Sequence, residues 1–439
     1  MDKYSEILNW LYGLRGGEID LRLDRMERAL GLFDHPEKKF LSFHIAGTNG
    51  KGSVSAILHR ILSLAGYRTA LYTSPHLVSF TERICIGEKE ITPDEVVSLT
   101  AEIRDRIDGA RIPLTYFEFV TVMAFVHFAR QQIDVGVIEV GLGGRLDATN
   151  LVRPIASAIT TISKDHEAYL GSDLASIARE KAGIIKAGVP VTCGALPAEA
   201  VQVVKKIANE RGAPCYFLNS EYNFALKNDD HFDYKGIDDH FDYKGIKEEY
   251  FELSVALRGR HQKANAAVAL SALEIAGPSV PVSEAVIREG LRTVRWPGRF
   301  EVLCEAPTIV LDGAHNGEGA KALADLLESF RRGRKVKFLF ASMQDKDWRL
   351  ILDTLVPHAQ EFVFTRVAME RSADPASLAD YVKAKRPCQV IENSQDALES
   401  LVASAHADDI VMIAGSLYLL GEIRPAAQAI AAKLSAGAA

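Results

Sequence analysis

Short apolar runs alternate along this chain with longer stretches of helical periodicity. The first run, residues 40–46, ends at a glycine-rich turn, and residues 53–65 then carry apolar side chains at helical spacing. Further runs of similar length predict the other strands, at residues 67–73, 135–140, 155–162, 189–193, 308–312, 336–340, 362–365, 389–391 and 410–414. Strands separated by helices are typical of a parallel sheet with helices on both faces. The pattern therefore predicts an α/β fold.

The alternation is interrupted at Trp296-Pro297-Gly298, where a rigid residue is followed by a flexible one. We interpret this point as an interdomain linker, because 439 residues also favour more than one domain at roughly 150 residues each. The prediction is a parallel-sheet domain over residues 1–297 and a smaller α/β domain over residues 298–439. The alanine-rich stretch after Arg424 predicts a final helix.

Composition and charge exclude several classes of protein. Lys and Arg number 51 against 58 Asp and Glu, a net charge of −7 that disfavours nucleic acid or an anionic membrane as the main partner. The five cysteines are scattered without CxxC spacing, so we expect neither disulfides nor a zinc site. The charged N-terminus lacks the features of a signal peptide, and no apolar run approaches the roughly 20 residues of a membrane span. We expect a cytoplasmic protein.

One segment departs from the alternating pattern. Residues 229–237 read DDHFDYKGI, and residues 238–246 repeat these nine letters. The unit is too short for a solenoid repeat, and two copies are too few for an array. Its histidines and aspartates could bind a metal, but we expect a duplicated surface loop or hairpin extension and assign no chemistry to it.

The turn after the first predicted strand carries the first candidate chemistry. Residues 47–53 read GTNGKGS and lie between a strand and a helix, which is the context that a phosphate-binding loop requires. Lys51 would pair with the β- and γ-phosphates, and a hydroxyl would reach Mg²⁺. Gly52 departs from the standard motif, because it separates Lys51 from Ser53. An ordinary glycine turn is the alternative, but the context favours nucleotide binding.

Polar residues follow three other predicted strands. In an open parallel sheet ligands bind at the carboxyl ends of the strands, so Ser74, Glu139 and Asp165-His166 should face the same edge as the phosphate loop. Glu139 ends an apolar run, where its carboxylate needs compensation, and Mg²⁺ prefers oxygen ligands. From chemistry alone His166 is either a metal ligand or a structural hydrogen-bonding group, and Ser74 is typical of a turn.

Nine motifs occur in order within a stretch of similarity to a known family that runs from about residue 15 to residue 424: AGTNGKGS, TSPHL, TYFEF, EVGLGGRLDATN, SKDHEAYLG, REKAGIIK, GRHQKANA, RWPGRF and DGAHN. Together they resemble the folylpolyglutamate synthase family of the Mur ligase superfamily. The resemblance implies a P-loop-containing parallel-sheet domain of the Mur ligase central type and a smaller, Rossmann-like C-terminal glutamate ligase domain. The forms TYFEF and RLDATN are most similar to the bifunctional members, which act on dihydropteroate as well as on folates.

The resemblance also implies roles for individual residues. The residues matching those that bind ATP are Thr48, Asn49, Gly50, Lys51, Gly52, Ser53, Asn265, Arg299 and Asp312. The residues matching the magnesium ligands are Ser74, Glu139 and His166, and the resemblance implies two Mg²⁺ sites, the second of which Lys181 helps to organise. The residues matching the pterin-binding segments are Thr115, Tyr116, Phe117, Leu146, Asp147 and Ala148. The matching catalytic residues are Lys51, Lys181 and His315, of which Lys181 is carbamylated in the family. Without the resemblance, Lys181 beside Glu180 is typical of an exposed helical lysine.

The implied reaction is ATP-dependent addition of L-glutamate to dihydropteroate and to the glutamate tail of reduced folates, through an acyl phosphate. We expect a monomer whose partners are these small molecules, without nucleic acid or membrane. A folylpolyglutamate-only enzyme and a Mur-type ligase acting on a UDP-sugar peptide are the alternatives within the superfamily. A nucleotide switch of the P-loop class is the alternative outside it, but a switch does not need the second domain with DGAHN.

Overall fold

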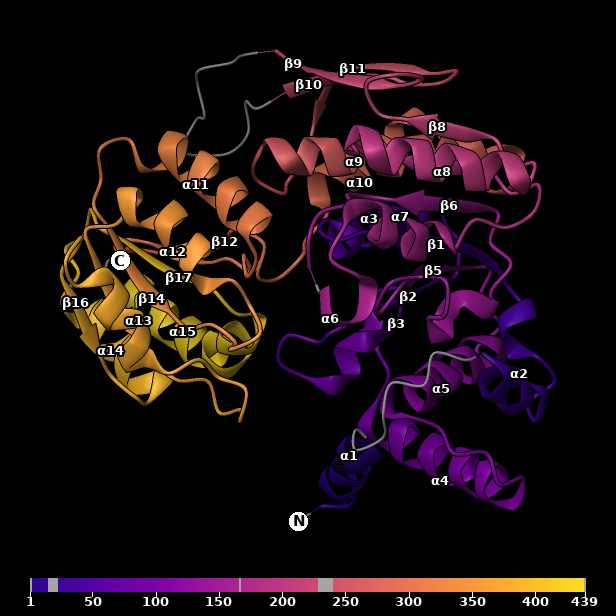
Figure 1. Ribbon diagram of the computed structural model, residues 1–439, viewed down its shortest axis with the longest axis horizontal. Helices are drawn as coiled ribbons and strands as arrows, with labels where there is room; N and C mark the ends of the chain where they lie inside the picture. The colour runs from indigo at the N-terminus through magenta and orange to yellow at the C-terminus, as the bar shows by residue number, and fades with distance from the viewer. Residues whose placement is uncertain (1, 15–22, 166, 228–239, 438–439) are drawn as a thin grey trace.

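The computed structural model describes residues 2–14, 23–165, 167–227 and 240–437 (Figure 1). Two large sheets organise the chain, one in each of two lobes that lie side by side. The first has eight strands in the order β4-β3-β2-β5-β1-β6-β7-β8, and the second has six in the order β12-β13-β17-β14-β15-β16. The predicted α/β class is confirmed, because helices cover both faces of each sheet.

Six strands of the first sheet are parallel, and two antiparallel strands extend one edge. The parallel strands are β1 (Leu41–Ala46), β2 (Thr69–Tyr72), β5 (Val135–Glu139), β6 (Ala156–Ile159), β7 (Val191–Cys193) and β8 (Cys215–Phe217). The antiparallel strands are β3 (Ile84–Ile86) and β4 (Lys89–Glu90). The five strands predicted for this lobe are confirmed, with ends shifted by a few residues. The short strands β3, β4 and β8 were not predicted, since each has too few residues to show a pattern.

Side chains alternate between the two faces of the first sheet, and each face buries an apolar layer. Phe43, Ile45 and Val137 pack with the helices of one face, which are α3 (Lys51–Leu64), α9 (Arg260–Ala276) and α10 (Glu284–Thr293). Tyr72 and Ile138 face the opposite layer. The helices on that side are α1 (Lys3–Gly13), α2 (Asp24–Gly31), α4 (Pro93–Gly109), α5 (Tyr116–Arg130), α6 (Glu167–Leu170), α7 (Leu174–Ala182) and α8 (Ala198–Glu210). The lobe is therefore a three-layer arrangement centred on β1 and β5.

Residues 240–244 of the second copy of the duplicated segment form a strand, not a surface loop. A three-stranded antiparallel sheet is formed by β9 (Asn223–Leu226), β10 (His240–Lys244) and β11 (Glu249–Ser254), with β10 in the centre. Phe241 and Tyr243 are buried against the α9 side of the first lobe. The expectation of a loop was wrong here, because alternating aromatic side chains give this copy one apolar face; the hairpin alternative holds. The first copy lies outside the described residues.

The second lobe contains the strands predicted after Gly298. Its parallel strands are β13 (Thr308–Leu311), β14 (Val336–Phe340), β15 (Glu361–Phe364), β16 (Cys388–Val390) and β17 (Ile410–Ala414), and β12 (Glu301–Glu305) is antiparallel to β13. The helices of one face are α11 (Gly317–Arg331), α12 (Trp348–Leu355) and α13 (Pro375–Val382), and those of the other are α14 (Ser394–Ala403) and α15 (Leu417–Gly437). The final helix begins well before Arg424, because Leu419, Leu420 and Ile423 are buried on the sheet.

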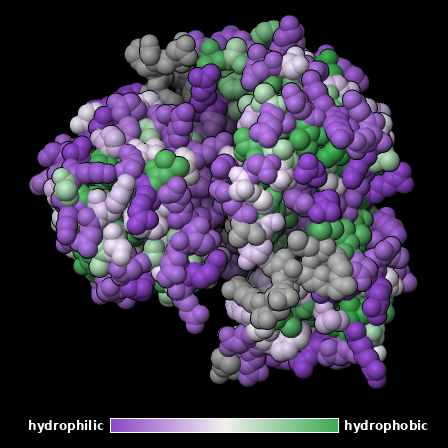
Figure 2. Space-filling view, in the orientation of Figure 1, coloured by the Kyte–Doolittle hydropathy of each residue, from purple (hydrophilic) through white to green (hydrophobic). Residues whose placement is uncertain are grey.

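Short helices and loops complete the described chain. The 3-10 helices are η2 (Pro36–Lys38), η3 (Phe80–Arg83), η4 (Ala148–Leu151), η5 (Gly277–Ser279) and η6 (Val356–His358). Among the described helices none is both long and apolar enough to cross a membrane. The loops after β1, β2, β5 and β6 lie at the carboxyl edge of the first sheet, and the loop after β13 faces them across the cleft between the lobes (Figure 2).

Candidate active site

A cavity of about 300 Å³ lies at the carboxyl edge of the first sheet, where the second lobe faces it. This volume is at the lower end of the range for small-molecule sites. The predicted residues that line it from the first lobe are Thr48, Asn49, Gly50, Lys51, Gly52, Ser53, Ser74, Glu139, Lys181 and Asn265. Those that line it from the linker and the second lobe are Arg299, Asp312 and His315. The edge predicted from strand topology is therefore the edge where these residues meet.

Two glycines give the loop after β1 its shape. Gly47 and Gly50 have φ of +150° and +85°, a region that side chains rarely adopt. A Cβ atom at Gly50 would lie 2.5 Å from Oδ1 of Asn265, and one at Gly47 would lie 1.9 Å from Oγ1 of Thr160. The loop can therefore approach α9 and β6 only with glycine at these positions. Because Gly50 precedes α3, the free N–H groups of the first helical turn lie at the cavity, which favours an anion there.

Gly52, the departure from the standard motif, has a packing reason. A Cβ atom at Gly52 would lie 2.8 Å from Nε1 of Trp296. The first turn of α3 therefore contacts the indole at the junction between the two lobes. The extra glycine lets the segment at Trp296 lie directly against the phosphate-binding loop.

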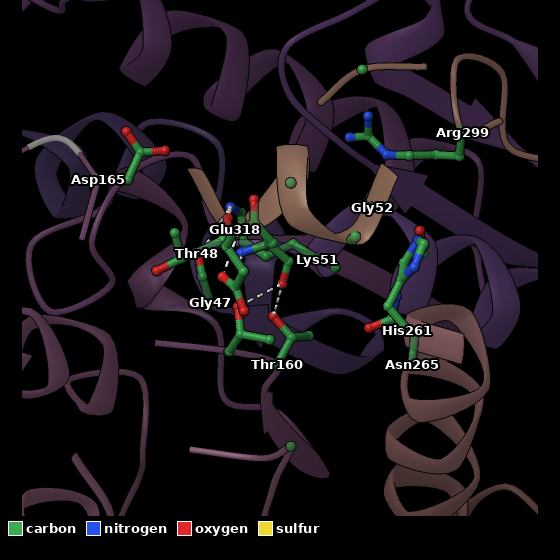
Figure 3. Close-up of a pocket in the computed structure, with 18 of the residues that line it drawn as sticks. Gly47, Thr48, Lys51, Gly52, Thr160, Asp165, His261, Asn265, Arg299 and Glu318 are labelled. Atoms are coloured by element: carbon green, nitrogen blue, oxygen red, sulfur yellow. Dashed lines mark hydrogen bonds between the residues drawn. The ribbon is translucent and has the colours of Figure 1, made fainter. Parts of the chain in front are cut away.

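Glu139 is buried at the carboxyl edge of the sheet, and Lys51, at the start of α3, is partly buried. The ammonium of Lys51 donates to the carbonyl oxygens of Gly47 at 3.0 Å and Thr48 at 3.2 Å. Burial lowers the pKa of Lys51 and raises the pKa of Glu139, because desolvation outweighs the attraction between the two charges. An anion and a cation bound in this cavity would favour the charged form of each group. In Figure 3 Gly47, Thr48 and Lys51 lie at the centre, with His261 and Asn265 on one side and Asp165 on the other.

Ser74 and Glu139 meet as predicted, and their donor atoms fit a hard divalent cation. The backbone N–H of Ser74 donates to Oε2 of Glu139 at 3.1 Å, and both residues line the cavity. A buried carboxylate beside a hydroxyl offers the oxygen ligands that Mg²⁺ prefers. His166, the third predicted ligand, lies outside the described residues. The described residues contain no cluster of three or more His, Cys, Asp or Glu side chains suited to a metal.

Lys181 is buried. The prediction of an exposed helical lysine, made from the local sequence without the family resemblance, was wrong. Lys181 is 4% exposed on α7, and its Nζ donates to the carbonyl oxygen of Gly47 at 2.9 Å. The helix directs this residue under the phosphate-binding loop, whereas its neighbour Glu180 reaches Arg145 near the surface. Burial, together with the nearby charge of Lys51, lowers the pKa of Lys181 to about 7.

The loop after β13 brings Asp312 and His315 to the cavity. Asp312 accepts hydrogen bonds from the backbone N–H groups of Ala314 and Phe300, both at 2.9 Å, and burial raises its pKa although Arg299 opposes this. Nδ1 of His315 donates to the carbonyl oxygen of Gly313 at 2.7 Å, which leaves Nε2 as an acceptor. Burial lowers the pKa of His315 to about 4, so the ring is neutral at pH 7.

Polar residues that were not predicted join the two lobes around the phosphate-binding loop. Glu318, in the first turn of α11, accepts hydrogen bonds from Asn49 at 2.6 Å and from Ser163 at 2.7 Å. Lys346 forms an ion pair with Asp165 at 2.6 Å, and both side chains are about nine-tenths buried. Glu318 lies two residues after the DGAHN motif, so its position in the sequence could have indicated a site residue. The loop that carries Lys346 has no sequence signal, because only the packing of the lobes brings it there.

The segment Thr115, Tyr116 and Phe117 lies beside the cavity and does not line it. Thr115 and Glu118 cap the N-terminus of α5 reciprocally, which fixes the start of the helix. A Cβ atom at Gly141 would lie 2.4 Å from Cζ of Phe117, so the tip of the Phe117 ring contacts the glycine-rich loop that borders the cavity.

The residues Leu146, Asp147 and Ala148 close the same loop from below. Asp147 is buried, and its carboxylate accepts hydrogen bonds from Leu142 N at 2.9 Å and Thr149 N at 3.0 Å. Its side chain therefore holds the loop in place, and Leu142, which it binds, lines the cavity. The two predicted pterin segments are thus neighbours along one side of the cavity.

The fold and the cavity define a P-loop-type, two-lobed anion-binding site. Residues 45–273 match the Mur ligase middle domain, and residues 298–417 match the Mur ligase glutamate ligase domain. A dihydrofolate synthase/folylpolyglutamate synthase of Bacillus subtilis (strain 168) is 32% identical over 435 residues, which cover 96% of this chain and 98% of that protein.

Solved structures agree with this match. Escherichia coli FolC in complex with DHPP and ADP has 31% identity and a TM-score of 0.89, with 97% of this chain and 98% of that chain covered. The bifunctional folylpolyglutamate synthase/dihydrofolate synthase of Yersinia pestis, complexed with AMPPNP and a Mn ion, has 32% identity and a TM-score of 0.86, with 97% and 98% covered. This chain belongs to the dihydrofolate synthase/folylpolyglutamate synthase family of Mur ligases.

Proposed function

We propose that this chain uses ATP to join L-glutamate to the carboxylate of dihydropteroate and to that of the glutamate tail of reduced folates. The observation that carries the proposal is the single cavity in which a phosphate-binding loop, the Ser74–Glu139 pair and the second-lobe residues Asp312 and His315 meet. The E. coli relative was solved with DHPP and ADP, which supports the same pair of ligands here.

The reaction proceeds through an acyl phosphate. A carboxylate oxygen of the acceptor attacks the γ-phosphorus of ATP, the bond to the β–γ bridging oxygen breaks, and ADP leaves. The α-amine of L-glutamate then attacks the acyl carbon, an amide forms, the amine loses a proton, and phosphate leaves. Such chemistry needs positioning and charge stabilisation more than covalent help from the protein.

The residues of the loop after β1 hold the nucleotide. The N–H groups from Thr48 to Ser53 and the ammonium of Lys51 surround the phosphates, and Asn265 contacts the base beside Gly50. Arg299 and Asp312 approach from the linker and second lobe. Ser74, Glu139 and His166 would hold one of two Mg²⁺ ions. When bound, Mg²⁺ stabilises the negative charge that develops on the transferred phosphoryl group.

Lys181 and His315 complete the machinery. A lysine whose pKa is about 7 carries a neutral amine that can add CO₂ and release a proton, so Lys181 is the residue that becomes the carbamate. A carbamate on Lys181 would help to hold the second Mg²⁺. Neutral His315 offers Nε2 to the incoming amine and positions L-glutamate.

The pterin lies along the side of the cavity formed by the two neighbouring segments Thr115–Phe117 and Leu146–Ala148. The chain divides into domains of residues 1–297 and 298–439, since the two large sheets share no strand in the described part of the chain. Contacts of Glu318 and Lys346 with the first lobe close the cavity and protect the acyl phosphate from water. The enzyme acts as a monomer in the cytoplasm.

Glutamate-dependent ADP release from the purified protein tests the proposal. Dihydropteroate, tetrahydrofolate and a UDP-muramoyl peptide are supplied separately with ATP and Mg²⁺. We expect turnover with the first two and none with the third. Turnover with tetrahydrofolate alone restricts the enzyme to chain extension, and turnover only with the UDP-muramoyl peptide contradicts the assignment to folates.

A further inference from the structure

Arg83, at the end of η3, is a buried cation that the roles above do not use. The residue is 5% exposed. Among the described residues no carboxylate forms an ion pair with its guanidinium, whereas the largely buried Arg25 and Arg424 are paired with Glu118 and Glu301. Arginine is almost never buried without such a partner, because desolvation of the charge is costly. This unpaired guanidinium therefore suggests a missing anion.

Neutral groups hold the guanidinium in place. Nε of Arg83 donates to Nδ1 of His76 at 2.8 Å, and the guanidinium carbon lies 5.6 Å from the centre of the Tyr116 ring. Because His76 accepts this hydrogen bond through Nδ1, it orients Arg83 without neutralising it. The ring of Tyr116 supports a cation through its negative face. The positive charge is thus fixed in position and remains available to an anion.

The backbone of Arg83 lies beside the segment that carries Ser74. Its carbonyl oxygen accepts a hydrogen bond from Thr73 N at 3.1 Å, directly before Ser74. On the other side it faces Tyr116, which belongs to a proposed pterin segment. Its positive charge also acts on the carboxylate of Glu139, the other residue of the proposed metal site. Arg83 therefore lies between the proposed metal site and the proposed pterin site.

We infer that Arg83 binds the carboxylate of the acceptor, the group that ATP phosphorylates, and that His76 positions the guanidinium for this contact. The inference rests on the proposed function. Guanidinium matches a carboxylate with two parallel hydrogen bonds, which fixes the plane of the carboxylate as well as its position. One oxygen is then held by Arg83 while the other is directed to the γ-phosphorus. The reacting group is a carboxylate in dihydropteroate and in the glutamate tail of folates, so the same kind of contact suits both acceptors.

Binding of two ligands in the absence of ATP tests this contact. The probes are dihydropteroate and its carboxamide, which keeps the pterin and removes the negative charge. The wild-type protein should bind dihydropteroate more tightly than the carboxamide. In R83Q the ratio of the two dissociation constants should fall by about 10- to 100-fold, the usual worth of a charge-assisted hydrogen bond, with the carboxamide affinity unchanged. The ratio in R83K should lie between the ratios of the wild-type protein and R83Q, since lysine keeps the charge but loses the paired geometry.

Arg60→Gln is the matched control, because Arg60, on α3 of the first lobe, pairs with the exposed Glu88 in the turn between β3 and β4. It should keep the wild-type ratio. Equal loss of affinity for both ligands in R83Q, or a change confined to the KM for L-glutamate, overturns the inference. If R83Q does not fold, an R83K variant with the wild-type ratio overturns it as well. Equal binding of both ligands to the wild-type protein rejects the role of Arg83 while the proposed function stands, and binding of neither rejects both.

Discussion

Replacement of Lys181 by alanine tests the least conventional part of the site. At pH 7 an ordinary lysine with a pKa of 10.5 is neutral in about one molecule in three thousand, whereas a pKa of about 7 makes roughly half of the molecules neutral. Burial thus raises the amount of amine that can add CO₂ by about a thousandfold. Lys181→Ala should lower turnover by about 10- to 100-fold, as loss of a group that organises a metal site does.

Three measurements separate a carbamate from a simple lysine. Acetate or formate should partly restore turnover to Lys181→Ala, because a small carboxylate can replace the missing anion. Turnover of the wild-type enzyme should fall after removal of CO₂ and bicarbonate. At limiting CO₂ it should also fall as the pH drops below about 7, since protonated Lys181 cannot react. The control is Arg179→Ala, an exposed residue of the same helix, which should behave as wild type. Wild-type turnover in Lys181→Ala would refute the reasoning, and full indifference to CO₂ would refute the carbamate.

Two further variants separate chemistry from stability. Lys51→Ala should abolish turnover and leave the thermal unfolding temperature close to wild type, because Lys51 hydrogen-bonds only loop carbonyl groups among the described residues; retained ADP release would remove it from the phosphate site. Phe241→Ala should lower the free energy of unfolding by about 3–5 kcal/mol through a cavity in the packed face of β10, with turnover kept below the unfolding temperature; calorimetry showing unchanged stability would contradict the burial of this strand.

Much of the fold could be predicted because local sequence patterns identify most of the strands. The apolar runs that become β1, β5 and β6 stop where a glycine or a polar residue begins, so the carboxyl edge and the meeting of Ser74 with Glu139 followed from topology. The strand β10 could also have been predicted from the sequence. Its residues alternate polar and aromatic over positions 240–244, which is the period of a strand with one buried face.

The parts that were missed depend on long-range packing. The burial of Lys181 is set by the loop that lies across α7, and the ion pair of Lys346 with Asp165 requires the second lobe to lie against the first. Arg83 belongs to no recognisable sequence motif. Its inferred role rests on the absence of a carboxylate partner among the described residues. Such features need the three-dimensional arrangement, because residues far apart in the chain create them.

The central claim is that the acceptor carboxylate is phosphorylated before the amine of glutamate attacks it. The most direct measurement uses dihydropteroate labelled with ¹⁸O in its carboxylate, with ATP, Mg²⁺ and L-glutamate, followed by mass analysis of the released phosphate. The account predicts that each phosphate released carries one ¹⁸O atom, because the carboxylate oxygen that attacks the γ-phosphorus leaves with it. Phosphate without label, formed together with the amide product, would contradict the acyl phosphate mechanism.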